Sequence, residues 1–71
     1  MKQALLDGLA EIMEVPVDEA TVLNEAGTWD SLAVVCTIAL LDEKAGVQAE
    51  GEALMACVTA ADVLRIAGVP A

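Results

Sequence analysis

The sequence lacks histidine, and this absence limits what its other reactive side chains can do. Histidine is the usual general base for a serine or cysteine nucleophile and the commonest protein ligand of transition metals. Cys36 and Cys57 lie far apart without a histidine, and the acidic residues lack the spaced oxygen ligands of a calcium loop. We therefore expect no metal site, no self-contained hydrolytic activity and two inert cysteines.

One segment, Gly27-Thr28-Trp29-Asp30-Ser31-Leu32, combines a hydroxyl group with the pattern of a helix start. Asp30 is a good N-cap residue, which places Ser31 in the first turn of the helix that follows. There its hydroxyl points to solvent, near unpaired backbone N–H groups and the positive end of the helix dipole. A phosphodiester on Ser31 would be stabilised at that position. The alternative is that Ser31 is only a polar residue at a helix start.

Apolar spacing predicts the elements that must position Ser31. Apolar residues recur every three or four positions between residues 2 and 13, which predicts a first helix there. Pro16 disfavours helical geometry at the residue before it, and residues 16–28 contain several turn formers. We expect a long ordered loop without regular structure. Three apolar residues would pin it to the helices: Val17, Val22 and Leu23.

The second half of the chain predicts one long and two shorter helical segments. A second helix runs from Ser31 to about Ala45 and is closed by Gly46. Its expected buried stripe is Leu32, Val34, Val35, Ile38 and Leu41. Residues 52–57 predict a short helical turn with Leu54 and Met55 as apolar anchors. A last helix begins at Thr59 and Asp62, a pair that resembles a capping box. Its inward-facing residues are Val63, Ile66 and Ala67. It ends at Gly68 and Pro70.

These elements predict an all-α fold, a bundle of three main helices plus one short helix, in a single domain over residues 1–71. The hydrophobic fraction is 58%, supplied by aliphatic residues with one Trp and no Phe or Tyr. The longest apolar run, residues 32–41, is too short to span a bilayer. The two cysteines do not form a regularly spaced disulfide framework, and the sequence shows no secretory signal pattern. We therefore expect a cytoplasmic location.

Charge narrows the range of partners. Twelve acidic residues against three basic ones give a formal charge of −9 at pH 7. Such a balance repels nucleic acids and anionic membranes, favours a monomer and attracts enzymes with basic patches. The simpler alternative is that acidity only keeps a small helical protein soluble.

The order of these motifs resembles the acyl carrier and peptidyl (aminoacyl) carrier proteins over nearly the whole chain. Asp30-Ser31-Leu32 begins a helix after a first helix and a long loop. Downstream, Leu-Leu-Asp-Glu-Lys-Ala-Gly and Val-Thr-x-x-Asp-Val fall where that family has them. The resemblance implies a non-catalytic, acyl-carrier-protein-like bundle with a long loop between its first two main helices.

The resemblance also implies a cofactor and partners. A phosphopantetheinyl transferase would move a 4'-phosphopantetheine arm from coenzyme A onto Ser31, and the arm would carry acyl or aminoacyl groups as thioesters. An acyl- or aminoacyl-activating ligase would load the arm, and a downstream transferase or synthase would unload it. The expected partner-recognition residues are Trp29, Asp30, Leu32, Ala33, Cys36, Asp42 and Glu43. Trp29 could instead anchor the core, and Leu32 could serve both the core and a contact surface.

The face next to Ser31 departs from the pattern of fatty-acid carriers, which is rich in acidic residues. The expected outward positions Ala33 and Cys36 are uncharged, as are Thr37 and Leu40, and acidic residues return only at Asp42 and Glu43. This pattern favours contacts by packing, as in peptidyl and aminoacyl carriers, and a specialised biosynthetic pathway. The rival hypothesis is an unmodified acidic interaction module of the same fold.

Overall fold

The computed structural model describes residues 1–70, and within them the chain forms five helices and no β-strand. The helices are α1 (Lys2–Met13), α2 (Leu23–Ala26), α3 (Ser31–Ala45), α4 (Gly51–Met55) and α5 (Ala60–Ile66). The all-α prediction is confirmed, with α1, α3 and α5 as the main helices and a loop between α1 and α3. No helix in residues 1–70 has the length and apolar character needed to cross a membrane.

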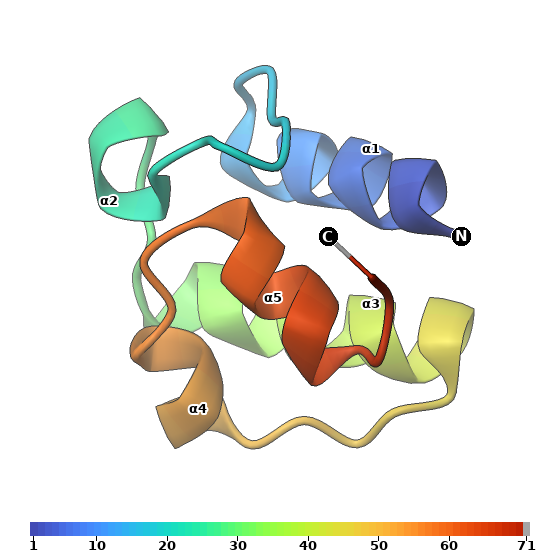
Figure 1. The fold of residues 1–71 in the computed structure, drawn as a ribbon. Helices are drawn as coiled ribbons and strands as arrows, with labels where there is room; N and C mark the ends of the chain where they lie inside the picture. The colour runs from blue at the N-terminus through green and yellow to red at the C-terminus, as the bar shows by residue number, and fades with distance from the viewer. Residues whose placement is uncertain (71) are drawn as a thin grey trace.

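The three main helices enclose one apolar core. α1 packs against both α3 and α5, and α3 packs against α4. Figure 1 shows α2, α4 and the first turn of α3 gathered at one end of the bundle. The largest fully buried side chains are almost all leucines, contributed by every helix: Leu5, Leu9, Leu23, Leu41, Leu54 and Leu64. Branched aliphatic side chains alone thus fill most of the space between the helices.

The loop between α1 and α3 is more regular than its composition predicts. It contains the short helix α2, so the expectation of no regular structure is wrong, and the fold has two short helices instead of one. Leu23 is fully buried, which confirms its predicted anchoring role. The loop also pairs with the chain before α5: Leu23 N–H donates to Val58 O at 2.9 Å, and Ala60 N–H donates to Thr21 O at 3.0 Å. These bonds occupy backbone groups that a free loop would leave to water.

α3 begins at Ser31 and ends before Gly46, as predicted, but it buries a different face. Leu32 and Val35 are 70% and 61% exposed, so their predicted place in the buried stripe is wrong. The buried residues of the helix are Ala33, Val34, Thr37 and Leu41. Thr37 tolerates the core because its hydroxyl donates to Ala33 O at 2.8 Å. α3 is apolar on nearly every side, so its periodicity alone does not select the face that packs.

The last two helices largely follow their local signals. α4 spans residues 51–55, shorter and earlier than the predicted turn at residues 52–57, and only Leu54 anchors it, because Met55 is 50% exposed. The capping box of α5 is confirmed: Thr59 and Asp62 each bond the other's backbone N–H. The chain leaves α5 through Gly68, whose φ of 76° lies in the left-handed region.

Candidate functional site

Ser31 is the first residue of α3, and its side chain is exposed. Asp30 has extended backbone geometry and caps the helix, because its carboxylate accepts the N–H of Ala33 at 3.0 Å. Its carbonyl accepts the N–H of Val34 at 2.9 Å. This arrangement leaves the first-turn N–H groups of Ser31 and Leu32 without an intrahelical carbonyl. Ser31 therefore combines an accessible hydroxyl with the positive end of a helix of 15 residues.

The surroundings of Ser31 bear on what its hydroxyl group can do. The sequence has no histidine to act as a base beside it, and its neighbour Asp30 uses its carboxylate as a helix cap. A group attached to the hydroxyl as a phosphate ester would lie near the first-turn N–H groups of α3.

An apolar groove lies between α3 and α4 and reaches Ser31. Its volume is about 630 Å³, and it is lined from α3 by Ser31, Val34, Val35 and Ile38 and from the α4 side by Gly51, Glu52, Met55 and Ala56. Val35 and Met55 stand on opposite walls, and both are at least half exposed. Exposed apolar side chains at a groove are typical of surfaces that bind another group. Sequence reasoning missed this groove, because it placed Val35 and Met55 inside the core.

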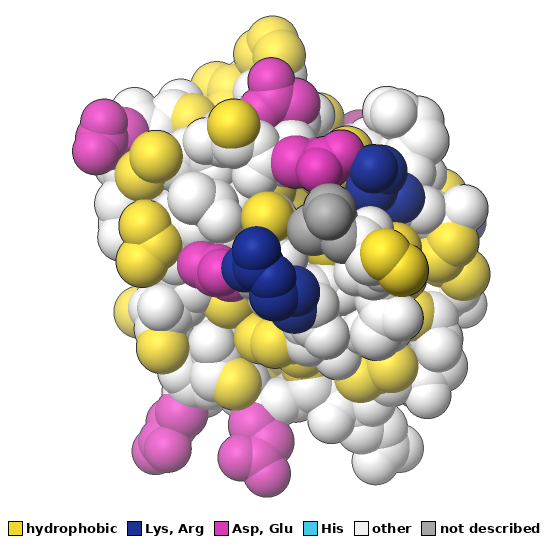
Figure 2. All heavy atoms as spheres, in the orientation of Figure 1, with side chains coloured by type: hydrophobic (Ala, Val, Ile, Leu, Met, Phe, Trp, Pro, Cys, Tyr) yellow, Lys and Arg dark blue, Asp and Glu magenta, His cyan; other side chains and the backbone are white. Residues whose placement is uncertain are grey.

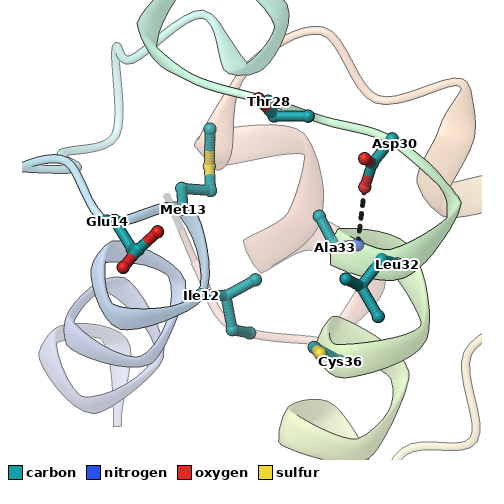
Figure 3. Close-up of a pocket in the computed structure, with 8 residues that line it drawn as sticks. All are labelled: Ile12, Met13, Glu14, Thr28, Asp30, Leu32, Ala33 and Cys36. Atoms are coloured by element: carbon teal, nitrogen blue, oxygen red, sulfur yellow. Dashed lines mark hydrogen bonds between the residues drawn. The ribbon is translucent and has the colours of Figure 1, made fainter.

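A second, smaller pocket lies on the other side of the α3 N-terminus, against the end of α1 (Figure 3). Its volume is about 270 Å³. Figure 3 shows Leu32 and Cys36 on one wall, Ile12 and Glu14 opposite them, and the bond from Ala33 to Asp30 at the rim. The exposed start of α3 therefore separates two hollows, of which only the groove toward α4 includes Ser31.

The predicted recognition residues are distributed over different environments. Asp30, Leu32 and Cys36 are exposed near Ser31. Ala33 is buried, which corrects its predicted outward position, and Trp29 is only 5% exposed, which agrees with the alternative of core anchoring. Asp42 and Glu43 are exposed but lie about three turns along α3, about 17 to 18 Å from Ser31 at 1.5 Å per residue. They do not belong to the same local surface as Ser31.

The exposed residues of α3 that follow Ser31, up to Leu41, are uncharged, but they are not all the residues predicted to face outward. The exposed residues of α3 between Ser31 and Leu41 are Leu32, Val35, Cys36 and Ala39. Thr37 and Leu40, predicted to face outward, are buried and half-buried. A signal for this surface exists in the sequence, because a helix that is apolar on every side must expose one apolar stripe.

The two cysteines differ in environment. Cys36 is exposed on α3, whereas Cys57 is buried and donates its thiol to Ala53 O at 3.4 Å. Burial raises the pKa of the Cys57 thiol, and the negative charge of Asp62 raises it further. Within residues 1–70, no three His, Cys, Asp or Glu side chains converge as a metal site would require.

Acidic side chains outnumber basic ones in this protein. On the face seen in Figure 2, acidic groups stand at the upper and lower edges and also beside the two separate basic groups. Lys2 and Arg65 are each engaged in an ion pair of 2.6 Å, with Glu19 and Asp62 respectively. The surface therefore presents excess negative charge to its surroundings.

Comparison with known proteins returns no match: no family model, no curated protein and no solved structure is similar to the chain. A functional proposal therefore depends on the sequence motif and on the geometry around Ser31. That geometry combines an exposed hydroxyl, a helix N-terminus and an apolar groove.

Proposed function

We propose that this chain is a non-catalytic carrier protein that holds acyl or aminoacyl intermediates as thioesters on a 4'-phosphopantetheine arm at Ser31. The observation that carries the proposal is the exposed hydroxyl of Ser31 at the capped start of α3. The resemblance of Asp30-Ser31-Leu32 and of the helix order to acyl and peptidyl carrier proteins supports it.

The residues around Ser31 fit such an arm. The first-turn N–H groups of α3 would stabilise the phosphodiester, and the groove between α3 and α4 offers an apolar surface next to it. The arm, when attached, supplies the thiol that forms the thioester. In the attachment step, the Ser31 hydroxyl oxygen would bond to the phosphorus of coenzyme A that bears the pantetheine arm. The pyrophosphate bond would break, adenosine 3',5'-bisphosphate would leave, and the hydroxyl proton would pass to the transferase or to solvent.

The partners follow from this role. A phosphopantetheinyl transferase would install the arm, an activating ligase would load it, and a transferase or synthase would unload it. The exposed residues of α3 between Ser31 and Leu41 are all uncharged, so these enzymes would dock on this helix by packing more than by charge. We place the carrier in a specialised biosynthetic pathway with an amino-acid-activating ligase, in the cytoplasm and as a monomer. Loading by fatty acyl enzymes but by no amino-acid-activating ligase would refute the choice of ligase.

One experiment tests the carrier function directly. The purified protein is incubated with coenzyme A and a phosphopantetheinyl transferase of broad specificity, and its intact mass is measured. Ser31 is the only serine in the sequence, so a gain of one phosphopantetheine group that Ser31→Ala abolishes locates the arm. Thr28→Ala is a matched control, because Thr28 is an exposed hydroxyl residue just before the helix, and this variant should still gain the group.

The rival function is an acidic interaction module that binds a partner without an arm. The exposed apolar residues Val35 and Met55 favour it, because both line the α3–α4 groove whether or not Ser31 is modified. No mass gain, with a transferase that modifies a known carrier in the same assay, would refute the carrier and leave the interaction module.

A further inference from the structure

Trp29 connects the segment that leads into α3 with the opposite wall of the groove. Its indole Nε1–H donates a hydrogen bond of 3.0 Å to the backbone carbonyl of Leu54, near the end of α4. The two residues are 25 positions apart in sequence, and both are buried. The same carbonyl also accepts the N–H of Cys57 at 3.1 Å, so the indole bond occupies its second lone pair.

α4 depends on such tertiary contacts. It has five residues and no side-chain hydrogen bond at its N-cap, Glu50. A helix this short is not stable by itself in water. Leu54 is its fully buried side chain, whereas Met55 is half exposed and lines the groove. The packing of α4 on α3, the burial of Leu54 and the indole bond therefore hold it in place.

The shape of the groove depends on where α4 lies. Val34, Val35 and Ile38 form the α3 wall, and Gly51 and Met55 belong to the α4 wall. The walls come together at Gly51, where a Cβ would lie 3.8 Å from Val34 Cγ1. A small shift of α4 would change the distance between the walls.

We propose that Trp29 is a positioning residue that fixes α4 against α3 and thereby shapes the groove beside Ser31. The indole does this from two residues before the attachment point, so the wall of the groove and the start of α3 are held to each other. The inference also extends to docking, and this extension rests on the proposed carrier function. The transferase that modifies Ser31 recognises the groove in the shape that Trp29 maintains.

Hydrogen exchange tests the positioning role without any partner. Trp29→Phe keeps an aromatic ring and removes the hydrogen-bond donor. Val63→Ala is the control, because it destabilises the protein through a residue of α5 that does not line the groove. The amides of Ala56 and Cys57 bond to carbonyls of α4, and we expect Trp29→Phe to speed their exchange about fivefold, the effect of one net hydrogen bond. We expect Val63→Ala to leave them unchanged. Equal acceleration in both variants, or none in Trp29→Phe, would overturn the proposal.

Transfer kinetics test the extension to docking. With the transferase and coenzyme A, Trp29→Phe should raise the KM for the apo protein about fivefold at unchanged kcat, and Val63→Ala should leave both constants unchanged. If Trp29→Phe does not fold, benzothienylalanine at position 29 removes the N–H while keeping the ring shape. If the variant at position 29 has the KM of the wild type, the extension to docking is overturned and the carrier function is left intact. If the wild-type protein itself is not modified, the carrier function and the extension both fail, and the exchange comparison still decides the positioning role.

Discussion

The side chain of Leu40 on α3 lies directly over the backbone of Gly8 on α1. A Cβ built on Gly8 would be 2.5 Å from Leu40 Cδ1 and 2.9 Å from Cδ2, closer than real contacts allow. The absence of a side chain at Gly8 therefore permits the two helices to approach each other.

Gly8→Ala should raise the free energy of unfolding by less than the gain of about 1 kcal/mol that helix propensity alone would give, because the Leu40 side chain must shift. In a Leu40→Ala background the same change should raise stability by the full amount of about 1 kcal/mol, since only the propensity gain remains. Urea unfolding of the four proteins measures both effects. An equal effect of Gly8→Ala in both backgrounds would contradict the proposed contact.

Glu14 ends α1 in a left-handed conformation, with φ 58° and ψ 33°, which is unfavourable for a residue with a side chain. Glu14→Gly should therefore raise the free energy of unfolding by roughly 1 kcal/mol. Glu11→Gly removes the same charge from the interior of the helix and should lower stability by roughly 1 kcal/mol. Chemical denaturation of both variants checks the prediction, and destabilisation by Glu14→Gly would show that its side chain contributes more than the strain costs.

Asp62 makes the stability of the start of α5 dependent on pH. The backbone N–H groups of Val58 and Thr59 donate to its carboxylate and, together with Arg65, hold its pKa below the ordinary value of 3.8. A folded-state pKa below the unfolded value adds stability above about pH 4, and this stability is lost as the pH falls through the folded pKa.

Asp62→Asn should therefore destabilise the protein at neutral pH, and the difference from wild type should shrink in acid. Thermal unfolding measured from neutral to acid pH follows this difference. Asp42→Asn, an exposed residue on α3, controls for the loss of one negative charge. A difference that stays constant across the whole range would be incompatible with the assigned role of the Asp62 carboxylate.

The cysteines should react at very different rates with a maleimide reagent. Cys36 is exposed, whereas Cys57 is 5% exposed and burial raises its pKa, so little of its thiol is the reactive thiolate. We expect one label per native chain and two after unfolding, counted by mass. Cys36→Ser should reduce native labelling to near zero. Rapid native labelling of that variant would mean that the region after α4 opens readily.

Val35 should contribute to the docking of the transferase beside Ser31, more than an equally exposed apolar residue outside the groove. Val35→Asn places a polar group in the wall of the α3–α4 groove and should lower kcat/KM of phosphopantetheine transfer about tenfold. Val58→Asn changes a side chain of similar exposure outside the groove lining and should alter it less than about twofold. Equal losses in the two variants would argue against the groove as the recognised feature.

The position of the candidate site could be predicted because it depends on local signals. Asp30 caps the helix through a bond to a residue three positions away, and Gly46 ends it with a left-handed turn. The same holds for Thr59 and Asp62 at the start of α5. Such contacts act within one turn of the chain, so residue type and spacing are enough to place Ser31 at the start of α3.

The sequence by itself thus determined the main helices and the exposed hydroxyl, whereas the surface around that hydroxyl was decided by the tertiary structure. α3 offers apolar residues on nearly every side, and only packing against α1 and α4 selects which of them are buried. Leu32 and Val35 became surface residues for that reason. The groove likewise depends on the bond from Trp29 to Leu54, which no local pattern indicates because it joins residues 25 positions apart.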